Sequence, residues 1–459
     1  MNTTTLQPQS VFDYFAQINK IPRPSHHEEK MIEFLIDFGK SLGLDTQVDK
    51  GGNVLIKKPA FPGYENAKGI ILQSHIDMVC EKVAGLDFDF FKDSIQTTID
   101  GEWMTAKGTT LGADDGIGVA MQMAVLADKS LKHGPLQCLF TTSEETGLGG
   151  AEQLEPGYIS GDYLLNLDSE DEGQIFISCA GGANTYATFP LTYEDIPTGF
   201  FTMKMRISGL TGGHSGDDII KKRANVNKLL SRILLTLIEK YDARLCDIQS
   251  GGLHNAIPRD GYAIICVPNN KKEDVRVDFN IIASEIEEEF RVTEKTMQFV
   301  LESYEAQTQA ISQDVTLRLI KALVGLPNGV LAMSQDIENF VETSSNLASV
   351  KKEGDEIKIV TSQRSNLLSA RKNASSMMRS VFSLAGAQTE SGDGYPGWKL
   401  NPNSPLLKIA VKTYTNMFGH EPLVLAIHAG LECGLFTEKY PNIDMISFGP
   451  TLRGVHSPD

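Results

Sequence analysis

Several features that define other classes of protein are missing from this sequence of 459 residues. The first nine residues are polar and lack the apolar core of a signal peptide, so we expect no secretory leader. No apolar run is long enough to span a bilayer, and we therefore expect no membrane partner. The six cysteines are scattered without a CxxC pair, which predicts reduced, mostly buried thiols and a cytoplasmic location.

Positive charge is also scarce, because 42 Lys and Arg residues are outnumbered by 59 Asp and Glu residues. The net charge of −17 argues against binding to nucleic acid, which requires a basic surface. The excess acid favours solubility, and part of it is available to hold metal. A hydrophobic content of 41% is ordinary for a globular protein, and the length predicts two or more domains.

A glycine-rich stretch at residues 109–118, TTLGADDGIG, carries two adjacent carboxylates, Asp114 and Asp115. Glycine lets the backbone pass close to a ligand, and a carboxylate held there has one oxygen for each of two cations. An apolar helical run follows at residues 119–126. By itself this pattern is more typical of a solvated turn in which an aspartate caps the helix.

Three predicted strands, at residues 69–75, 137–142 and 163–167, end in groups that can bind metal. These groups are His75 with Asp77, Glu144 with Glu145, and Asp168. The carboxyl ends of strands are the usual place for α/β chemistry. Alternation puts His75 and Asp77 on one side, which suits a metal-binding histidine held by an aspartate. Adjacent glutamates point in different directions, so one can bind metal while the other faces water.

Each of these strand ends has a simpler explanation when it is taken alone. A salt-bridged pair at a strand end accounts for His75 and Asp77, and a solvated turn accounts for Glu144 and Glu145. The repetition on three strands, with Asp114 between them in sequence, is what favours a metal centre.

Local patterns also predict where helices begin. Ser25 and Glu28 match a capping box for a helix over residues 26–42. Asp314 is the expected cap of another helix that ends near residue 325. Ser404 followed by Pro405 predicts a helix that ends at Gly419.

The pattern of hydrophobic residues changes after residue 182, where half-buried strands and amphipathic helices predict an α+β arrangement. Residues 201–207 alternate as a half-buried strand, and residues 226–238 form an apolar helical stripe. A hairpin is expected around residues 354–355. We therefore predict a catalytic domain at residues 1–182 plus 395–459, and an inserted domain at 183–394. Whether the inserted domain consists of two similar halves is left open.

The motifs together resemble the M20 family of di-zinc peptidases, and specifically its aminoacyl-histidine dipeptidase branch (Xaa-His dipeptidase, peptidase D type). The matching segments cover essentially the whole chain: residues 74–82, 112–116, 143–147, 167–173, 213–216, 428–434 and 454–458. The resemblance implies an α/β fold, with a zinc-peptidase catalytic domain of mixed sheet flanked by helices and an inserted α+β lid domain.

The resemblance also implies a set of ligands for two zinc ions. Asp114 would bridge the ions, with His75 and Asp168 completing one site and Glu145 and His456 the other. Asp77 would orient His75, and Glu144 would be the general base. Imidazole and carboxylate ligands suit zinc, and manganese or cobalt are possible substitutes.

In the inserted domain, the resemblance implies that His214 stabilises the oxyanion, Asn255 helps to bind substrate and Arg364 holds the substrate carboxylate. A guanidinium grips a carboxylate through two hydrogen bonds, which agrees with the last role. Glu432 is our own, less direct assignment for the free amino end. Without the resemblance, these residues are more typical of ordinary loop, turn and strand positions.

The sequence departs from the family pattern in two places. Asp115 stands where this branch has asparagine after the bridging aspartate, at a peptide bond that the family holds cis. The extra carboxyl either alters metal affinity or is protonated. The sequence also stops at Asp459, soon after His456, whereas relatives continue, so we expect weaker support for the last zinc ligand.

These observations predict a metalloprotease, a cytoplasmic hydrolase that cleaves small unblocked dipeptides, preferentially Xaa-His, with two Zn²⁺ ions. An N-acyl amino-acid deacylase or a carboxypeptidase on the same scaffold is the alternative enzyme. A non-catalytic metal-binding protein is a third reading, against which the intact Glu144 argues. A cysteine hydrolase using Cys80 and His75 is disfavoured, because no base–nucleophile geometry is implied. A homodimer is left open.

Overall fold

The computed structural model describes residues 6–458, which form two compact units. Unit 1 comprises Met1–Cys179, Trp398–Ala426 and Leu431–Asp459, and unit 2 comprises Ala180–Gly397 and Ile427–Gly430. Unit 2 is thus inserted into the sequence of unit 1. Residues 1–5 and Asp459, which bear on the predictions about the two ends of the chain, lie outside the described residues.

Unit 1 is built on an eight-stranded sheet in which parallel and antiparallel pairs are mixed, which confirms the predicted fold class. The strands, in their order across the sheet, are β1 (Asp45–Val48), β2 (Val54–Lys58), β6 (Leu136–Thr141), β3 (Ile70–His75), β7 (Tyr163–Asn166), β23 (Asp444–Ser447), β8 (Gln174–Cys179) and β22 (Leu423–Ile427). Strand β3 pairs in parallel with both β6 and β7. Strand β23 lies between β7 and β8, although it comes near the end of the sequence.

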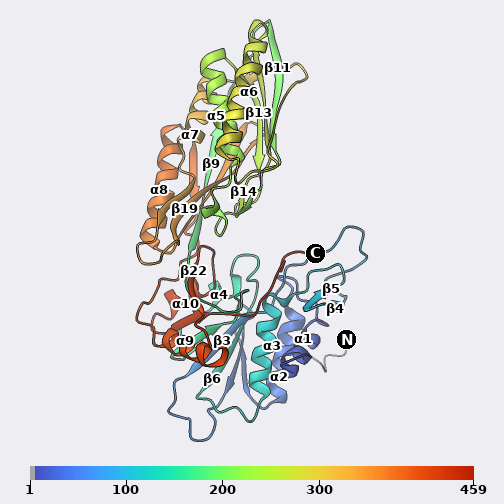
Figure 1. Cartoon of the computed structure of the whole chain (residues 1–459), viewed down its shortest axis with the longest axis vertical. Helices are drawn as coiled ribbons and strands as arrows, with labels where there is room; N and C mark the ends of the chain where they lie inside the picture. The colour runs from blue at the N-terminus through green and yellow to red at the C-terminus, as the bar shows by residue number, and fades with distance from the viewer. Residues whose placement is uncertain (1–5, 459) are drawn as a thin grey trace. The chain divides into compact units, whose positions relative to one another are not determined.

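Helices pack against this sheet through apolar side chains. They are α1 (Gln9–Ile18), α2 (Glu29–Ser41), α3 (Ala113–Ala127), α4 (Gly149–Gln153), α9 (Pro405–Phe418) and α10 (Cys433–Lys439). Helices α1 and α3 lie side by side (Figure 1). The core joins Phe15 of α1, Met31 of α2 and Val119 of α3 to Phe140 of β6, all buried. A separate hairpin is formed by β4 (Thr97–Asp100) and β5 (Trp103–Ala106).

The predicted capping box before α2 is wrong. The helix begins at Glu29 rather than at His26, and Glu28, which stands at the N-cap position, makes no capping hydrogen bond through its side chain. Instead, the Ser25 hydroxyl donates to Asp77 Oδ2 at 2.8 Å, and Glu28 Oε1 accepts from the backbone N–H of Ser143 at 2.9 Å. The two side chains match the local pattern but bind segments that are distant in sequence.

The other two predicted caps have opposite outcomes. Helix α7 (Gln313–Gly325) follows Ser312, so Asp314 lies in its first turn and is not the cap. The Asp314 carboxylate pairs with Arg318 at 2.7 Å. Ser404 does cap α9, because its Oγ accepts from the Leu407 N–H at 2.9 Å, which confirms that prediction.

Unit 2 contains a nine-stranded sheet, in which every described pair is antiparallel. Its order is β16 (Gln298–Ser303), β11 (Phe200–Ser208), β15 (Gly261–Pro268), β13 (Arg244–Gly251), β19 (Val341–Glu353), β20 (Glu356–Ser365), β9 (Gly181–Pro190) and β21 (Gln388–Ser391), with β18 (Gly329–Met333) also paired to β19. The predicted hairpin is confirmed, since β19 and β20 are joined at Gly354–Asp355. Two small pairs are β10 (Tyr193–Asp195) with β17 (Gln309–Ile311), and β12 (Gly213–His214) with β14 (Ala256–Ile257).

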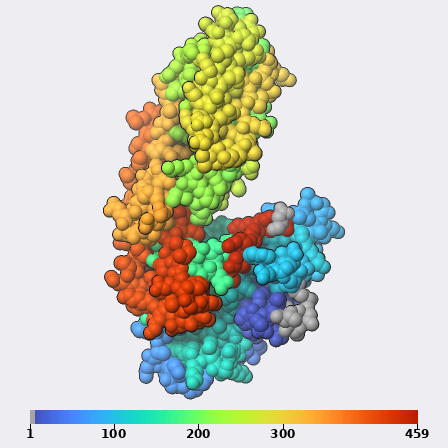
Figure 2. All heavy atoms as spheres, in the orientation of Figure 1, coloured from blue at the N-terminus to red at the C-terminus, as the bar shows by residue number. Residues whose placement is uncertain are grey.

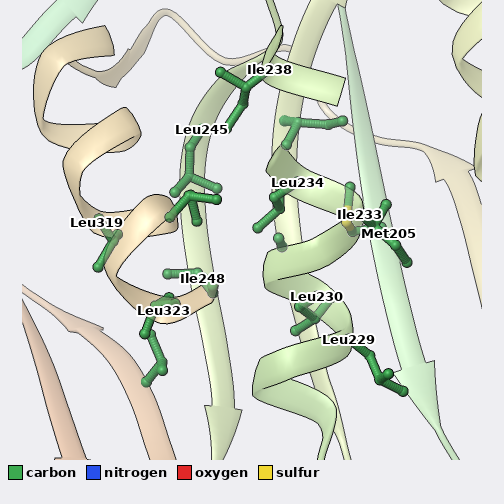
Figure 3. Packing of buried hydrophobic residues seen from close by; sticks show 14 of the residues in the cluster. Met205, Leu229, Leu230, Ile233, Leu234, Ile238, Leu245, Ile248, Leu319 and Leu323 are labelled. Carbon is green, nitrogen blue, oxygen red and sulfur yellow. The ribbon is translucent and has the colours of Figure 1, made fainter. Parts of the chain in front are cut away.

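Four helices cover this sheet: α5 (Val226–Tyr241), α6 (Lys272–Glu289), α7 and α8 (Leu368–Leu384). The apolar stripe predicted on residues 226–238 is the buried face of α5. Figure 3 shows this face, with Leu229, Leu230, Ile233 and Leu234, packed against the sheet, where Met205 of β11 and Leu245 and Ile248 of β13 lie, and beside Leu319 and Leu323 of α7. Packing of such a stripe, more than intrinsic helix propensity, stabilises a helix in a protein.

Among residues 6–458, no helix combines the length and the apolar character that a bilayer span demands.

Candidate metal centre

The parallel strands of unit 1 bring three predicted ligands to one edge of the sheet. His75 is the last residue of β3, and it lies opposite Thr141, the last residue of β6. Glu145 follows β6, and Asp168 follows β7 after a short interval. Because parallel strands place their carboxyl ends together, these side chains converge although they are far apart in sequence.

The first group of potential ligands consists of His75, Asp114 and Asp168. His75 Nε2 lies 2.9 Å from Asp114 Oδ1 and 3.4 Å from Asp168 Oδ1. Asp114 stands at the start of α3, after Gly112, whose φ of 69° is in the left-handed region. That conformation favours glycine and turns the chain into the helix.

The second group consists of Asp114, Glu145 and His456. His456 Nε2 lies 3.3 Å from Asp114 Oδ2 and 3.1 Å from Glu145 Oε2. Asp114 therefore presents one oxygen to each group. The His456 side chain is 55% exposed, against 1% for His75. Figure 2 shows the segment that follows β23, in dark red, at the surface of unit 1.

Neighbouring carboxylates raise the pKa values of both histidines. Burial lowers the pKa of His75, but Asp168, Asp114 and Asp77 raise it well above its ordinary value. Hydrogen bonds with Asp114 and Glu145 raise the pKa of His456 to about 10. Burial opposes ionisation of Asp114, yet the two histidines hold the pKa of its carboxyl well below the usual range.

The donor set fits two divalent cations. Burial raises the pKa of both Asp168 and Glu144 well above the ordinary range, and neighbouring carboxylates add to the effect. Glu145 Oε1 is buried, and no residue within 6–458 provides it with a hydrogen bond. Crowded carboxylates of this kind require positive charge, and imidazole with carboxylate oxygen is a typical ligand set for zinc. That the five residues bind metal stays a prediction.

Asp77 links the end of β3 to the loop that carries the two glutamates. Its Oδ1 lies 3.2 Å from His75 Nδ1 and accepts from the Glu144 N–H at 3.0 Å. Its Oδ2 accepts from the Ser25 hydroxyl at 2.8 Å and from the Glu145 N–H at 3.2 Å. Although burial alone would raise the pKa of Asp77, these partners lower it. This geometry suits a carboxylate that orients a metal-binding histidine, and that role of Asp77 stays a prediction.

Glu432 lies in the interior of unit 1, with no exposed surface. Its Oε2 accepts from Gln73 Nε2 at 2.5 Å and from Thr141 Oγ1 at 2.9 Å. Burial raises the pKa of its carboxyl to about 7. Its predicted contact with a substrate amino group stays a prediction.

Asp115, the departure from the family pattern, is buried, and its Oδ1 accepts from the Gly118 N–H at 3.2 Å. The peptide bond between Asp114 and Asp115 is cis, as the resemblance implies. Burial and the nearby Asp168 raise the pKa of Asp115 well above its ordinary value. This direction favours the protonated form, which is one of the two alternatives left open from the sequence.

The three predicted residues of the inserted domain all belong to unit 2. His214 pairs with Ala256 across β12 and β14, so Asn255 lies beside this pair, and its carbonyl accepts from the Ser215 N–H at 2.8 Å. Arg364 on β20 is only 6% exposed, and its Nη2 lies 3.4 Å from His214 Nε2. Their catalytic and binding roles stay predictions.

The structure adds residues that sequence reasoning missed. The Tyr395 hydroxyl accepts from Arg364 Nη1 at 3.0 Å within unit 2. His428, also in unit 2, lies 2.7 Å from the Ser344 hydroxyl, and burial lowers its pKa to about 3. In unit 1, Arg23 binds backbone around the candidate centre. Of these residues, only His428 could have been noticed in the sequence, because it is the first residue of the motif segment 428–434.

The chain is similar to known proteins over almost its whole length. The sequence pattern of peptidase family M20/M25/M40 matches residues 71–459. The chain is 43% identical over 457 residues to the cytosol non-specific dipeptidase of Escherichia coli, covering 99% of this chain and 94% of the relative. The crystal structure of an aminoacylhistidine dipeptidase from Vibrio alginolyticus has a TM-score of 0.89 and 44% identity, covering 100% of this chain and 94% of the other. A tripeptidase from Staphylococcus aureus shares the fold alone, with a TM-score of 0.55 and 16% identity over 98% of this chain and 92% of the other. The chain therefore belongs to peptidase family M20/M25/M40.

Proposed function

We propose that this chain is a cytoplasmic dipeptidase that uses two zinc ions to hydrolyse unblocked dipeptides, with Xaa-His preferred. The observation that supports it most directly is Asp114, whose two carboxylate oxygens face two different groups of ligands. The substrate class rests on the names of the two most similar proteins described above, a cytosol dipeptidase and an aminoacylhistidine dipeptidase.

In this proposal, His75 and Asp168 hold one ion, Glu145 and His456 hold the other, and Asp114 is shared. When bound, the pair supplies a Lewis acid for the scissile carbonyl and lowers the pKa of water to near neutrality. Asp77 keeps the His75 ring in place, because its carboxylate faces Nδ1 while Nε2 faces the ligand group.

Glu144 is the proposed general base. It accepts one proton from the attacking water while the new C–O bond forms, and it then delivers that proton to the amine nitrogen as the C–N bond breaks. Burial raises the pKa of its carboxyl, which makes the carboxylate a stronger base than an exposed glutamate. Its backbone N–H is bound to Asp77, so the residue starts from a fixed position.

Substrate ends are assigned to charged and polar groups. Arg364 is proposed to bind the terminal carboxylate, His214 to stabilise the oxyanion, and Asn255 to bind the substrate backbone. The Arg364 guanidinium is held by Tyr395, which leaves it little freedom and favours a directed carboxylate contact. Glu432 is proposed for the free amino end.

Turnover of matched substrates tests the function. The purified protein, stripped of metal and reloaded with Zn²⁺ or Mn²⁺, is given Ala-His, Ala-Ala, N-acetyl-Ala-His and Ala-Ala-His. We expect rapid cleavage of the free dipeptides, Ala-His first, and little cleavage of the blocked form or the tripeptide. Faster cleavage of the N-acetyl compound would indicate a deacylase or a carboxypeptidase. No turnover with bound metal would indicate a binding protein.

Glu144→Gln is the matched control for that assay, because it keeps the size of the side chain but removes the base. It is expected to bind metal as the unmodified protein does and to lose turnover. Loss of metal together with turnover would mean that Glu144 acts as a ligand instead.

A further inference from the structure

Arg23 is an unusual arginine, because it is one of the largest fully buried side chains of the chain, with 1% of its surface exposed. Pro22 and Pro24 flank it and keep the backbone extended, since proline disfavours a helical conformation in the residue before it. Pro24 forms a bridge with Met78, just beyond the end of β3. The segment therefore enters unit 1 next to the candidate metal centre.

The guanidinium of Arg23 joins two pieces of backbone that carry predicted ligands. Nη1 donates to the carbonyls of Ile76, at 3.0 Å, and Asp77, at 2.7 Å, directly after His75. Nη2 donates to the carbonyl of Gly112, two residues before Asp114. A planar fork of donors can hold both pieces at a fixed separation, which a lysine ammonium cannot do in the same way.

The turn that carries Asp114 is shaped around this guanidinium. A Cβ atom added to Gly112 would lie 2.5 Å from Arg23 Nη2, and one added to Gly116 would lie 2.6 Å from the same atom. Both distances are shorter than side chains tolerate. The two glycines on either side of Asp114 therefore provide the room that Arg23 occupies.

The residues that follow extend the same frame to the glutamate loop. The Ser25 hydroxyl donates to Asp77 Oδ2 at 2.8 Å. Glu28 Oε1 accepts from both the N–H and the hydroxyl of Ser143, at 2.9 Å and 2.8 Å, directly before Glu144. Residues 23–28, here called the strap, thus bind the end of β3, the Asp114 turn and the glutamate loop.

We propose that the strap positions the metal ligands, with Arg23 setting the separation of His75 from Asp114. This inference rests on the proposed metal centre. The described hydrogen bonds of Arg23 go to backbone carbonyls, so it acts through the backbone of the ligand-bearing segments. Removing such supporting contacts typically weakens metal binding or activity about 10- to 100-fold.

Arg23→Lys tests the proposal, because it keeps the charge and loses the fork. The metal-free variant is titrated with Zn²⁺ in competition with a chromogenic chelator, its fold is checked by circular dichroism, and kcat and KM are measured with excess metal. We expect about 10- to 100-fold weaker Zn²⁺ binding by folded protein and a lower kcat, with an unchanged KM. A purely structural arginine would lower the melting temperature and leave the Zn²⁺ affinity of the folded protein unchanged.

The matched control is Arg371→Lys in unit 2. Arg371 is also buried, and it also donates to three backbone carbonyls, those of Gly182, Tyr395 and Asp393. This substitution is expected to lower stability without changing Zn²⁺ affinity. An equal loss of Zn²⁺ affinity in both variants would contradict a specific role for Arg23.

Ser25→Ala decides the matter if the Arg23 variant does not fold. It removes one hydroxyl, and Ser178→Ala is its control, because the buried Ser178 hydroxyl donates at 2.8 Å to the Trp398 carbonyl. We expect Ser25→Ala, but not Ser178→Ala, to weaken Zn²⁺ binding several-fold. Unchanged affinity in Ser25→Ala and in any folded Arg23 variant would overturn the proposal. If the Arg23 and Ser25 variants bind Zn²⁺ more weakly but the metal-loaded original protein cleaves no dipeptide, the proposed function is refuted and the proposed role of the strap is not.

Discussion

Replacement of Asp77 by asparagine tests the connection between the end of β3 and the glutamate loop. The substitution preserves size and shape but removes the charge and one acceptor oxygen. If the remaining oxygen keeps its place near His75 Nδ1 and the Glu144 N–H, the new amide group faces Ser25 and the Glu145 N–H. The Ser25 hydroxyl can rotate and accept, but the Glu145 N–H is left opposite another donor.

The expected effect follows from that single mismatch. A buried donor without a partner costs about 1–3 kcal/mol. If this cost appears when the ligands are ordered around metal, Zn²⁺ binding weakens about 5- to 150-fold. Flipping the amide would instead place its NH2 group opposite His75 Nδ1 and the Glu144 N–H, so at least one backbone N–H lacks an acceptor in either orientation. The prediction is therefore independent of the amide orientation.

Competition between the metal-free protein and a chromogenic chelator measures the affinity, and circular dichroism confirms that the variant is folded. Asp128→Asn is the control, since Asp128 is exposed and also accepts from a backbone N–H and a serine hydroxyl, in its case both of Ser130 at 2.7 Å. Its Zn²⁺ affinity should be unchanged. If folded Asp77→Asn binds Zn²⁺ within twofold of the original protein, Asp77 does not orient the ligands.

Three further predictions concern charge in unit 1 and unit 2. The pKa of His456 is raised to about 10 in the metal-free protein, so protons compete with metal for this side chain. The affinity for Zn²⁺ or Mn²⁺ should therefore rise with pH up to about 10, and an affinity that does not change with pH would contradict this prediction. Folding raises the pKa of the Glu432 carboxyl from 4.5 to about 7, so the original protein loses stability, at most about 3 kcal/mol, as the pH increases through that range. Glu432→Gln removes this titration and should therefore stabilise the metal-free protein above pH 7. Urea unfolding at pH 8 and pH 5 checks it, and a constant difference between the two proteins at both values would refute the assignment. Arg364→Ala should raise KM for Ala-His at least tenfold while changing KM for its C-terminal amide little; equal effects on both substrates would exclude a carboxylate contact.

The parts of the fold and the centre that could be predicted are those with local signals. The apolar strands that end at His75, Glu145 and Asp168 are visible as runs followed by ligands, and the rules for parallel sheets place their ends together. The apolar spacing on α5 was equally local. These signals were sufficient for the α/β character of unit 1 and for the convergence of the three strand ends, whereas His456 was implied only by the family resemblance.

Residues that act through distant partners could not be assigned in this way. Ser25 and Glu28 match a capping box, yet their actual partners, Asp77 and Ser143, are far along the chain. Arg23 resembles any arginine in a loop until the fold surrounds it with carbonyls. Local pattern and tertiary contact compete for the same polar side chains, and the sequence does not show which one prevails.

The position of β23 inside the sheet has a consequence for biosynthesis. The ribosome releases β7 and β8 long before β23, the strand that separates them. Until then, β7 presents an open edge that can pair with the wrong partner. Unit 2, whose sequence lies in between, has time to fold first, as domains generally do during synthesis. The nascent chain therefore carries an unfinished sheet through most of its translation, and protection of that edge is a requirement for correct folding.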